Sequence, residues 1–222
     1  KGFGHPLNMT SYIRTAVLST SSLGARLFKK IIRAITPAPL LRVSLYTYHL
    51  LLAYVAAFLY GRPSRKLIVI GVTGTKGKSS TLEFLNAAFE EAGHKTALIG
   101  TVRIKIDTDS KPNLMRMSMP GRFYLQRFLA RAVKAGCTVA ILEMTSEGAR
   151  QHRHRAIDLD ALIFTNLAPE HIESHGSLEE YANSKFELAR GLLRSNKKRR
   201  VIVANYDDPQ GARYLQVPVE EK

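Results

Sequence analysis

The chain has 222 residues, of which 45% are hydrophobic and 23% charged, and these are the fractions of a globular protein that can bury one full core. Its single cysteine, Cys137, excludes a disulfide framework and suits a reducing compartment. The formal net charge is +15 at pH 7, and residues 1–66 carry +10 of it, because they hold ten Lys or Arg and no Asp or Glu. Such charge suits phosphorylated ligands or an anionic membrane surface, and no RNA-binding aromatic motif or helix-turn-helix spacing favours nucleic acid.

The first 63 residues predict a basic, helical and hydrophobic segment in front of the main domain. Residues 1–24 are rich in Ser and Thr and weakly patterned, which indicates disorder or loose helix. Residues 25–35 predict a basic amphipathic helix with Leu27, Ile31, Ile32 and Ile35 on one face. Residues 43–60 then form a stretch without a formal charge, at the lower limit of length for a membrane span.

A membrane span over residues 43–60 is the weaker interpretation. The stretch contains Ser44, Thr47, His49 and four tyrosines. A crossing would also export the basic residues that precede it, against the positive-inside bias. We therefore expect a helix that packs on the domain or lies in the membrane interface, so that peripheral contact with a membrane stays open.

Residues 66–81 hold the strongest pattern of the chain. Residues 67–70 are apolar and mostly β-branched, which predicts a buried strand, and a glycine-rich turn and a helical pattern follow. This order predicts a phosphate cradle, because glycines let backbone N–H groups converge on an anion at a helix N-terminus. In such a cradle Lys78 would reach the outer phosphates and Ser79 would hold Mg²⁺. The strict pattern G-x-x-x-x-G-K-S/T fails only at Val72, and we interpret the stretch as a nucleotide site.

The remaining segments alternate between strand and helix. We expect strands at 96–101, 138–142, 160–164 and 200–204, helices at 123–135 and 178–193, and a long polar loop at 107–120. This alternation predicts an α/β fold with a parallel sheet wound by helices. Four residues that each follow a predicted strand should share the sheet edge at which such folds bind ligands: Gly74, Glu143, Asn166 and Asn205. A carboxylate at that edge is placed to hold Mg²⁺ against phosphates.

Several segments resemble the Mur ligases, the ATP-dependent ligases that build the peptidoglycan stem peptide. Within that family they are most similar to the branch that adds the third residue to UDP-N-acetylmuramoyl-L-alanyl-D-glutamate. The segments follow the family's order: Gly74-Thr75-x-Gly77-Lys78-Ser79, Ser118-Met119-Pro120, residues 143–148 with Gln151-His152-Arg153, residues 164–167 with His171 and His175-Gly176, Lys185, and Asn205-x-Asp207-Asp208-Pro209. The resemblance implies a P-loop-type central domain over residues 64–222, preceded by the N-terminal segment of residues 1–63.

The resemblance also implies a role for each matching residue. ATP would be held by Gly74, Thr75, Lys76, Gly77, Lys78, Ser79 and Ser80, with Asn205 against the adenine. The catalytic residues would be Lys78, Glu143, His171 and Lys185. The Mg²⁺ ligands would be Ser79, Glu143, His171 and Lys185, the last as a carbamate, because a desolvated neutral amine that adds CO₂ becomes a carboxylate. The UDP-muramoyl dipeptide would be held by Ser118, Met119, Pro120, Ser146, Gln151 and Arg153.

The implied activity is the cytoplasmic ligation of an amino acid to the UDP-muramoyl dipeptide through an acyl phosphate, by a monomer that uses ATP and Mg²⁺. The chain departs from the family at Lys76, Met119 and Glu147, where asparagine, threonine and histidine are usual. Residues 1–63 do not resemble the family's UDP-binding domain, and its amino-acid-binding domain would follow Lys222, so we expect this stretch to be inactive alone. Two alternatives stay open: a ligase similar to folylpolyglutamate synthase, and a catalytically silent nucleotide-binding scaffold at the membrane.

Overall fold

A central β-sheet organises the chain in its computed structural model, which describes residues 38–169 and 177–222. Within these residues seven strands pair in the order β4-β3-β2-β5-β1-β6-β7. Their bounds are β1 Ile68–Thr73, β2 Thr96–Ile99, β3 Arg103–Ile106, β4 Asp109–Pro112, β5 Val139–Glu143, β6 Ala161–Phe164 and β7 Val201–Ala204. The β2, β5, β1, β6 and β7 strands run parallel, which confirms the predicted α/β class.

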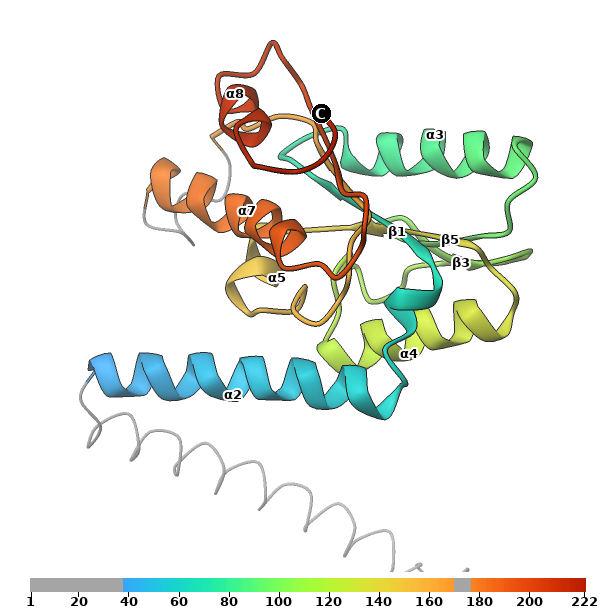
Figure 1. The fold of residues 1–222 in the computed structure, drawn as a ribbon, viewed down its shortest axis with the longest axis horizontal. Helices are drawn as coiled ribbons and strands as arrows, with labels where there is room; N and C mark the ends of the chain where they lie inside the picture. The colour runs from blue at the N-terminus through green and yellow to red at the C-terminus, as the bar shows by residue number, and fades with distance from the viewer. Residues whose placement is uncertain (1–37, 170–176) are drawn as a thin grey trace, which may run out of the picture. The chain divides into compact units, whose positions relative to one another are not determined.

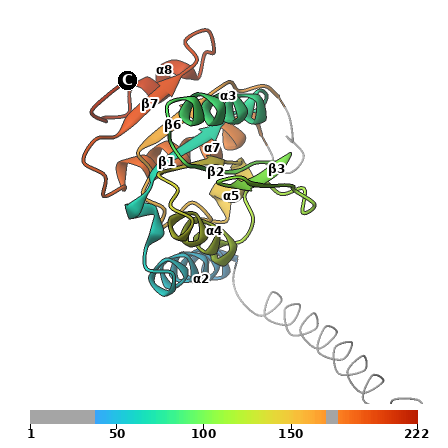
Figure 2. The ribbon, with the colours of Figure 1, turned by 90° about the vertical axis from the view of Figure 1, so that its right-hand side faces the viewer.

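Helices cover both faces of this sheet, as Figures 1 and 2 show, with α3 on one side and α4 on the other. The bounds of the helices are α2 Ala38–Leu59, α3 Lys78–Glu91, α4 Arg122–Lys134, α5 Ser146–Arg150, α7 Leu178–Leu193 and α8 Gly211–Leu215, with a short 3-10 helix η1 at Pro63–Lys66. The chain divides into two compact units, Lys1–Thr47 and Tyr48–Lys222. The sheet and the helices that cover it belong to the second unit.

The alternation of side chains along the parallel strands builds two apolar layers. On β5, Val139 and Ile141 pack toward α3 in a cluster with Leu82, while Ala140 and Leu142 lie in the larger cluster of the opposite face. That larger cluster takes most of its helical side chains from α4 and α7, with Ala149 of α5 and Tyr214 of α8. Strands that are apolar on both faces are what a parallel sheet covered by helices requires.

One edge of the sheet differs from the prediction. Residues 107–120 were expected to form a long loop, but β3 and β4 pair antiparallel as a hairpin, with Arg103 opposite Pro112. The β4 strand is short, polar and exposed along its whole length. Such a strand has no hydrophobic alternation to reveal it in a sequence, because charges and a proline suit a sheet edge rather than a core.

The other edge of the sheet is β7, and residues near the end of the chain pair with it. Glu221 forms a parallel bridge with Val201. The Ile202 N–H donates to the Glu221 carbonyl oxygen at 3.0 Å, and the Glu221 N–H donates to the Arg200 carbonyl oxygen at 3.2 Å.

The predicted helix at residues 43–60 is present as α2, which begins earlier, at Ala38. Pro39 therefore lies in its first turn, where proline is tolerated because no intrahelical hydrogen bond is lost. From Tyr48 onward α2 is anchored through small side chains, since Ala53, Ala56 and Ala57 are at most 2% exposed. None of the helices in the described residues has the length and apolar character needed to cross a bilayer. The predicted amphipathic helix at residues 25–35 lies outside the described residues.

Candidate functional site

The glycine-rich turn lies between the end of β1 and the start of α3, as predicted. Gly77 precedes the first helical residue with a φ of 79°, and Gly74 has a φ of 146°. A Cβ on Gly74 would lie 1.9 Å from the Thr165 hydroxyl oxygen, so this position requires glycine for space as well as for conformation. The first backbone N–H groups of α3 have no partner within the helix, and they carry its partial positive charge. The turn therefore has the geometry of an anion cradle.

The segment after β6 braces this turn. The Asn166 side chain accepts a hydrogen bond from the Lys76 N–H at 2.9 Å and donates one to the Lys76 carbonyl oxygen at 3.0 Å. The Thr165 hydroxyl donates to the same carbonyl oxygen at 2.7 Å. The sequence placed Asn166 at this edge but gave it no role, and Thr165 was missed. The turn is thus held from outside by two neighbouring polar side chains.

Glu143 lies at the end of β5 and is only 3% exposed. Its carboxylate accepts hydrogen bonds from the Thr101 N–H and the Thr101 hydroxyl, both at 2.8 Å. It also accepts one from the Ser79 hydroxyl of the turn, at 3.2 Å. A carboxylate and a hydroxyl therefore stand side by side at the start of α3, and oxygen ligands of this kind suit Mg²⁺. Thr101, which orients the carboxylate, was not identified from the sequence.

Two lysines contact the backbone of the turn. The Lys78 ammonium donates to the Thr75 carbonyl oxygen at 2.8 Å. The Lys185 ammonium, on α7 and 2% exposed, donates to the Gly74 carbonyl oxygen at 2.7 Å and lies over the Tyr181 ring. The structure therefore brings Lys185 to the turn, although a helix-surface position would be the ordinary expectation for a lysine in this pattern.

His171 falls outside the described residues, as does the pair His175-Gly176. Among the residues that the structure describes, no group of three or more His, Cys, Asp or Glu side chains is arranged to hold a metal ion. The oxygen pair of Ser79 and Glu143 is accordingly the part of the predicted metal set whose mutual geometry is known.

A second group of predicted residues meets beside α5. The Arg153 guanidinium donates to the Gln151 side-chain oxygen, at 2.7 and 3.1 Å, and to the Met119 carbonyl oxygen. Burial lowers the pKa of Arg153, against the opposite effect of the Glu147 carboxylate. Met119 itself is 3% exposed, and its sulfur occupies the space where a Cβ on Gly148 would lie. The methionine at this position is therefore a packing residue whose backbone, not its side chain, meets Arg153.

Arg122, at the start of α4, was missed by the sequence analysis. Its guanidinium donates to the Gln151 carbonyl oxygen. Burial lowers its pKa, and the charge of Arg153 lowers it further. The two guanidinium groups lie near each other because both donate to Gln151, Arg122 to its carbonyl oxygen and Arg153 to its side-chain oxygen. Ser118 and Pro120 flank Met119, Ser146 begins α5, and all three are buried. The only signal in the sequence was the position of Arg122 two residues after Pro120.

Asn205 lies directly after β7, at the same sheet edge as the turn. Its N–H donates to the Phe164 carbonyl oxygen at 3.0 Å, and its exposed side chain accepts from the Asp207 N–H at 3.1 Å. Asp208 braces this turn against the β6 end, because its carboxylate accepts from the Leu167 N–H at 2.7 Å. Gly74, Glu143, Asn166 and Asn205 thus lie at or just after the carboxyl ends of four parallel strands, which confirms the prediction that they share one edge of the sheet.

Comparison with known proteins gives a consistent result. The family model of the Mur ligase middle domain matches residues 72–221. A UDP-N-acetylmuramyl-tripeptide synthetase of Roseiflexus sp. (strain RS-1) is 37% identical over 187 residues, which are 81% of this chain and 36% of that protein. A solved UDP-N-acetylmuramoyl-L-alanyl-D-glutamate–2,6-diaminopimelate ligase has a TM-score of 0.57 and 29% identity, over 68% of this chain and 29% of that one.

A more distant similarity concerns the fold alone. A Mycobacterium tuberculosis folylpolyglutamate synthase, solved with ADP, has a TM-score of 0.55 and 19% identity, over 73% of this chain and 42% of that one. The chain spans about a third of the length of the curated relatives that it matches.

Proposed function

The chain belongs to the Mur ligase family, and on this premise we propose that it is the ATP-binding part of an ATP-dependent ligase that adds the third residue of the peptidoglycan stem peptide. Residues 64–222 would form the central domain and residues 1–63 a separate basic segment. The observation that carries the proposal is the pairing of the Ser79 hydroxyl with the buried Glu143 carboxylate at the start of α3. This pairing places metal-type oxygen ligands beside a phosphate cradle.

The residues around the turn fit Mg²⁺–ATP. Gly74 to Ser80 would surround the phosphates with backbone N–H groups, and Ser79 and Glu143 would hold Mg²⁺, with His171 as a further candidate ligand. Bound there, Mg²⁺ would neutralise charge on the phosphates. Lys78 would leave the Thr75 carbonyl oxygen for the outer phosphates, and Asn205, at the neighbouring strand end, would lie against the adenine.

The reaction would proceed by activation of a carboxyl group. A carboxylate oxygen of the UDP-muramoyl dipeptide attacks the γ-phosphorus of ATP, the bond to the β-phosphate oxygen breaks, and an acyl phosphate and ADP result. The amine of the incoming amino acid then attacks the acyl carbon, and inorganic phosphate and a proton leave as the amide forms. The contribution of Lys78 is electrostatic, because its charge offsets the charge that develops on the transferred phosphoryl group.

The cluster beside α5 would hold the dipeptide end of the substrate. Arg153 and Arg122 are half-buried guanidinium groups, and a guanidinium matches a carboxylate through two parallel hydrogen bonds. Gln151 fixes Arg153 in place, while Ser118 and Ser146 offer hydroxyl groups nearby. We propose Arg122 as an addition to the substrate-binding residues named from the sequence: Ser118, Met119, Pro120, Ser146, Gln151 and Arg153.

Lys185 would become a carbamate in the active protein. Addition of CO₂ to its amine forms an N–C bond and releases a proton, and the resulting carboxylate could serve the metal beside the cradle. The nearly complete burial of the side chain supports this role, because burial favours the neutral amine that the addition needs.

A coupled phosphate-release assay tests the proposal on the protein that contains this chain. Phosphate should appear only when ATP, Mg²⁺, a UDP-muramoyl dipeptide and an amino acid are present together, and Lys78→Ala should abolish the release. ATP hydrolysis at the same rate with and without the UDP-muramoyl dipeptide and the amino acid would refute the proposal. We propose that the protein works in the cytoplasm, which supplies ATP, and that the basic segment contacts the inner membrane face; co-sedimentation with anionic liposomes tests the contact.

A catalytically silent scaffold is the second candidate, and the substitutions at Met119 and Glu147 favour it. Met119 fills the space beside Gly148 with a thioether, where a hydroxyl is usual in the family. A scaffold would bind Mg²⁺–ATP in a calorimeter but would not bind the UDP-muramoyl dipeptide. Binding of both ligands would exclude it.

A further inference from the structure

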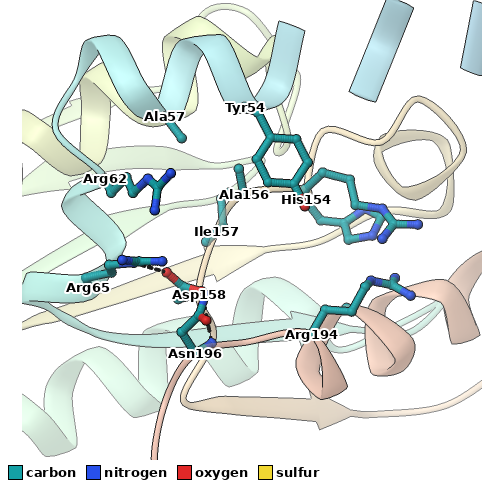
Figure 3. Close-up of a pocket in the computed structure, with 12 residues that line it drawn as sticks. Tyr54, Ala57, Arg62, Arg65, His154, Ala156, Ile157, Asp158, Arg194 and Asn196 are labelled. Carbon is teal, nitrogen blue, oxygen red and sulfur yellow. Dashed lines mark hydrogen bonds and ion pairs between the residues drawn. The ribbon is translucent and has the colours of Figure 1, made fainter. Parts of the chain in front are cut away.

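A second pocket lies far from the phosphate cradle, at the opposite ends of the strands. It is lined by η1 and its flanking residues, by the segment that leads into β6, and by the end of α7 (Figure 3). Arg65, Asp158 and Asn196 lie shortly before β1, β6 and β7, whereas the cradle lies after β1. The cavity measures about 90 Å³, compared with the roughly 30 Å³ that one water molecule occupies in the liquid. It therefore has room for a small polyatomic ligand.

Four arginines line this pocket and come from three different segments: Arg62, Arg65, Arg155 and Arg194. Among the described residues, two carboxylates pair with these arginines. Asp158 pairs with Arg65 at 3.0 Å, and Glu187 lies 3.7 Å from Arg155 and 3.5 Å from Arg194. Both carboxylates are already shared, because Asp158 also accepts two hydrogen bonds from Asn196. The four guanidinium groups thus outnumber the carboxylates, and the pocket is positive.

His154 adds an unsatisfied polar group to the same pocket. Its side chain is 3% exposed and lines the cavity, and in the described part of the chain neither ring nitrogen has a hydrogen-bond partner. The Nε atom of Arg155 is likewise buried without a partner there. Buried polar groups in native proteins are nearly always hydrogen-bonded, so donors left open around a cavity indicate a ligand.

We propose that this pocket binds a phosphate group. Arginines that approach from several segments suit a tetrahedral oxyanion, which offers oxygen atoms in several directions, better than a carboxylate, whose two oxygens lie in one plane. The site is separate from the cradle and does not depend on the function proposed above.

The phosphate could belong to a soluble anion or to a lipid headgroup. Tyr54 of α2 lines the pocket, and the same helix exposes Leu51, Phe58 and Leu59 at 61%, 73% and 66%. An apolar helix face beside a positive pocket is the chemistry of an anionic membrane surface. A free phosphate would need only the arginines and His154.

The test measures phosphate binding by the full chain in a Lys78→Ala background, which weakens binding at the cradle. Arg62→Gln removes an exposed guanidinium whose side chain makes no hydrogen bond or ion pair within the described residues, so the fold should survive the change. Arg194→Gln removes a second cation from the opposite wall. Arg116→Gln is the matched control, because Arg116 is also exposed and has a φ of 49°, close to the 50° of Arg62, but lies outside the pocket. Circular dichroism of each variant checks that it is folded.

Two arms use the same variants. The first titrates inorganic phosphate and follows the midpoint of thermal unfolding, and the second measures co-sedimentation with phosphatidylcholine vesicles with and without phosphatidic acid. We expect Arg62→Gln and Arg194→Gln each to weaken binding about tenfold, as for the loss of one charge-assisted hydrogen bond, and Arg116→Gln to leave it unchanged. The arm in which this occurs identifies the source of the phosphate. Equal binding by all variants in both arms would overturn the proposal.

Discussion

The contact between Met119 and Gly148 gives a prediction whose size follows from the structure. A Cβ built on Gly148 would lie 2.2 Å from the Met119 sulfur and 2.9 Å from its Cγ, whereas carbon atoms pack at about 3.5–4.0 Å. Met119 is 3% exposed, so its side chain cannot move out into water without leaving a cavity. In Gly148→Ala the added methyl group must therefore displace the methionine within a filled core.

Overpacking of this kind costs about 1–3 kcal/mol. For a domain of this size, each kcal/mol lowers the midpoint of thermal unfolding by about 2–4 °C. Met119→Ala should also destabilise, by about 2–5 kcal/mol, because it leaves a cavity beside Gly148. In the double variant the new methyl group occupies part of that cavity and meets no sulfur, so the two costs should not add.

Urea denaturation of the wild type, both single variants and the double variant measures this coupling. The double variant should be more stable than the sum of the single effects predicts, by about 0.5–3 kcal/mol. Additivity within about 0.5 kcal/mol would refute the argument, because it would show that the two side chains do not share one space.

Three further predictions concern the cradle and the second pocket. Gly74→Ala should abolish ATP binding in a calorimeter, because its Cβ would meet Thr165. Gly93→Ala should retain binding, because Gly93 also has a positive φ, of 83°, but its Cβ would have nothing within 4 Å. Glu143→Gln removes the charge of the side chain but keeps its shape, so it should raise the Kd for Mg²⁺–ATP about tenfold and change the Kd for metal-free ATP little. An equal rise in both Kd values would contradict a role in metal binding. Burial, aided by the charges of Arg155 and Arg194, lowers the pKa of His154 from 6.5 to about 3 in the folded chain. Between pH 6.5 and pH 3 the unfolded chain therefore binds a proton that the folded chain does not, and the free energy of unfolding falls as the pH falls through this range. His154→Leu should therefore lose less stability than the wild type between pH 7 and pH 5 in urea titrations, and an equal loss would show that the ring is not neutral in the folded chain.

The parallel core was predictable because its strands carry their own signal. Residues 67–70 and 139–142 are apolar on both faces, which predicts buried strands, and the glycines after β1 predict the turn. The β3–β4 hairpin could not be predicted from the sequence, because β4 is held only by its pairing with β3 at the sheet edge and buries no side chain.

In the candidate site, too, some residues could be predicted from the sequence and others could not. Glu143 and Lys78 were found because each sits at a fixed distance from a strong local pattern. Thr101 and Arg122 were missed because their contacts with Glu143 and Gln151 join segments 42 and 29 residues apart, and no local periodicity encodes such contacts.

The pairing of Glu221 with β7 bears on how the molecule behaves in a crowded solution. An uncovered outer strand presents a row of amide and carbonyl groups to which another chain can add. Here the Ile202 N–H and the Arg200 carbonyl oxygen are already engaged by Glu221. At the far side of the sheet, Pro112 lacks the N–H that an incoming strand would need. Both borders of the sheet therefore carry a feature that disfavours the addition of another strand, beside a strongly apolar centre.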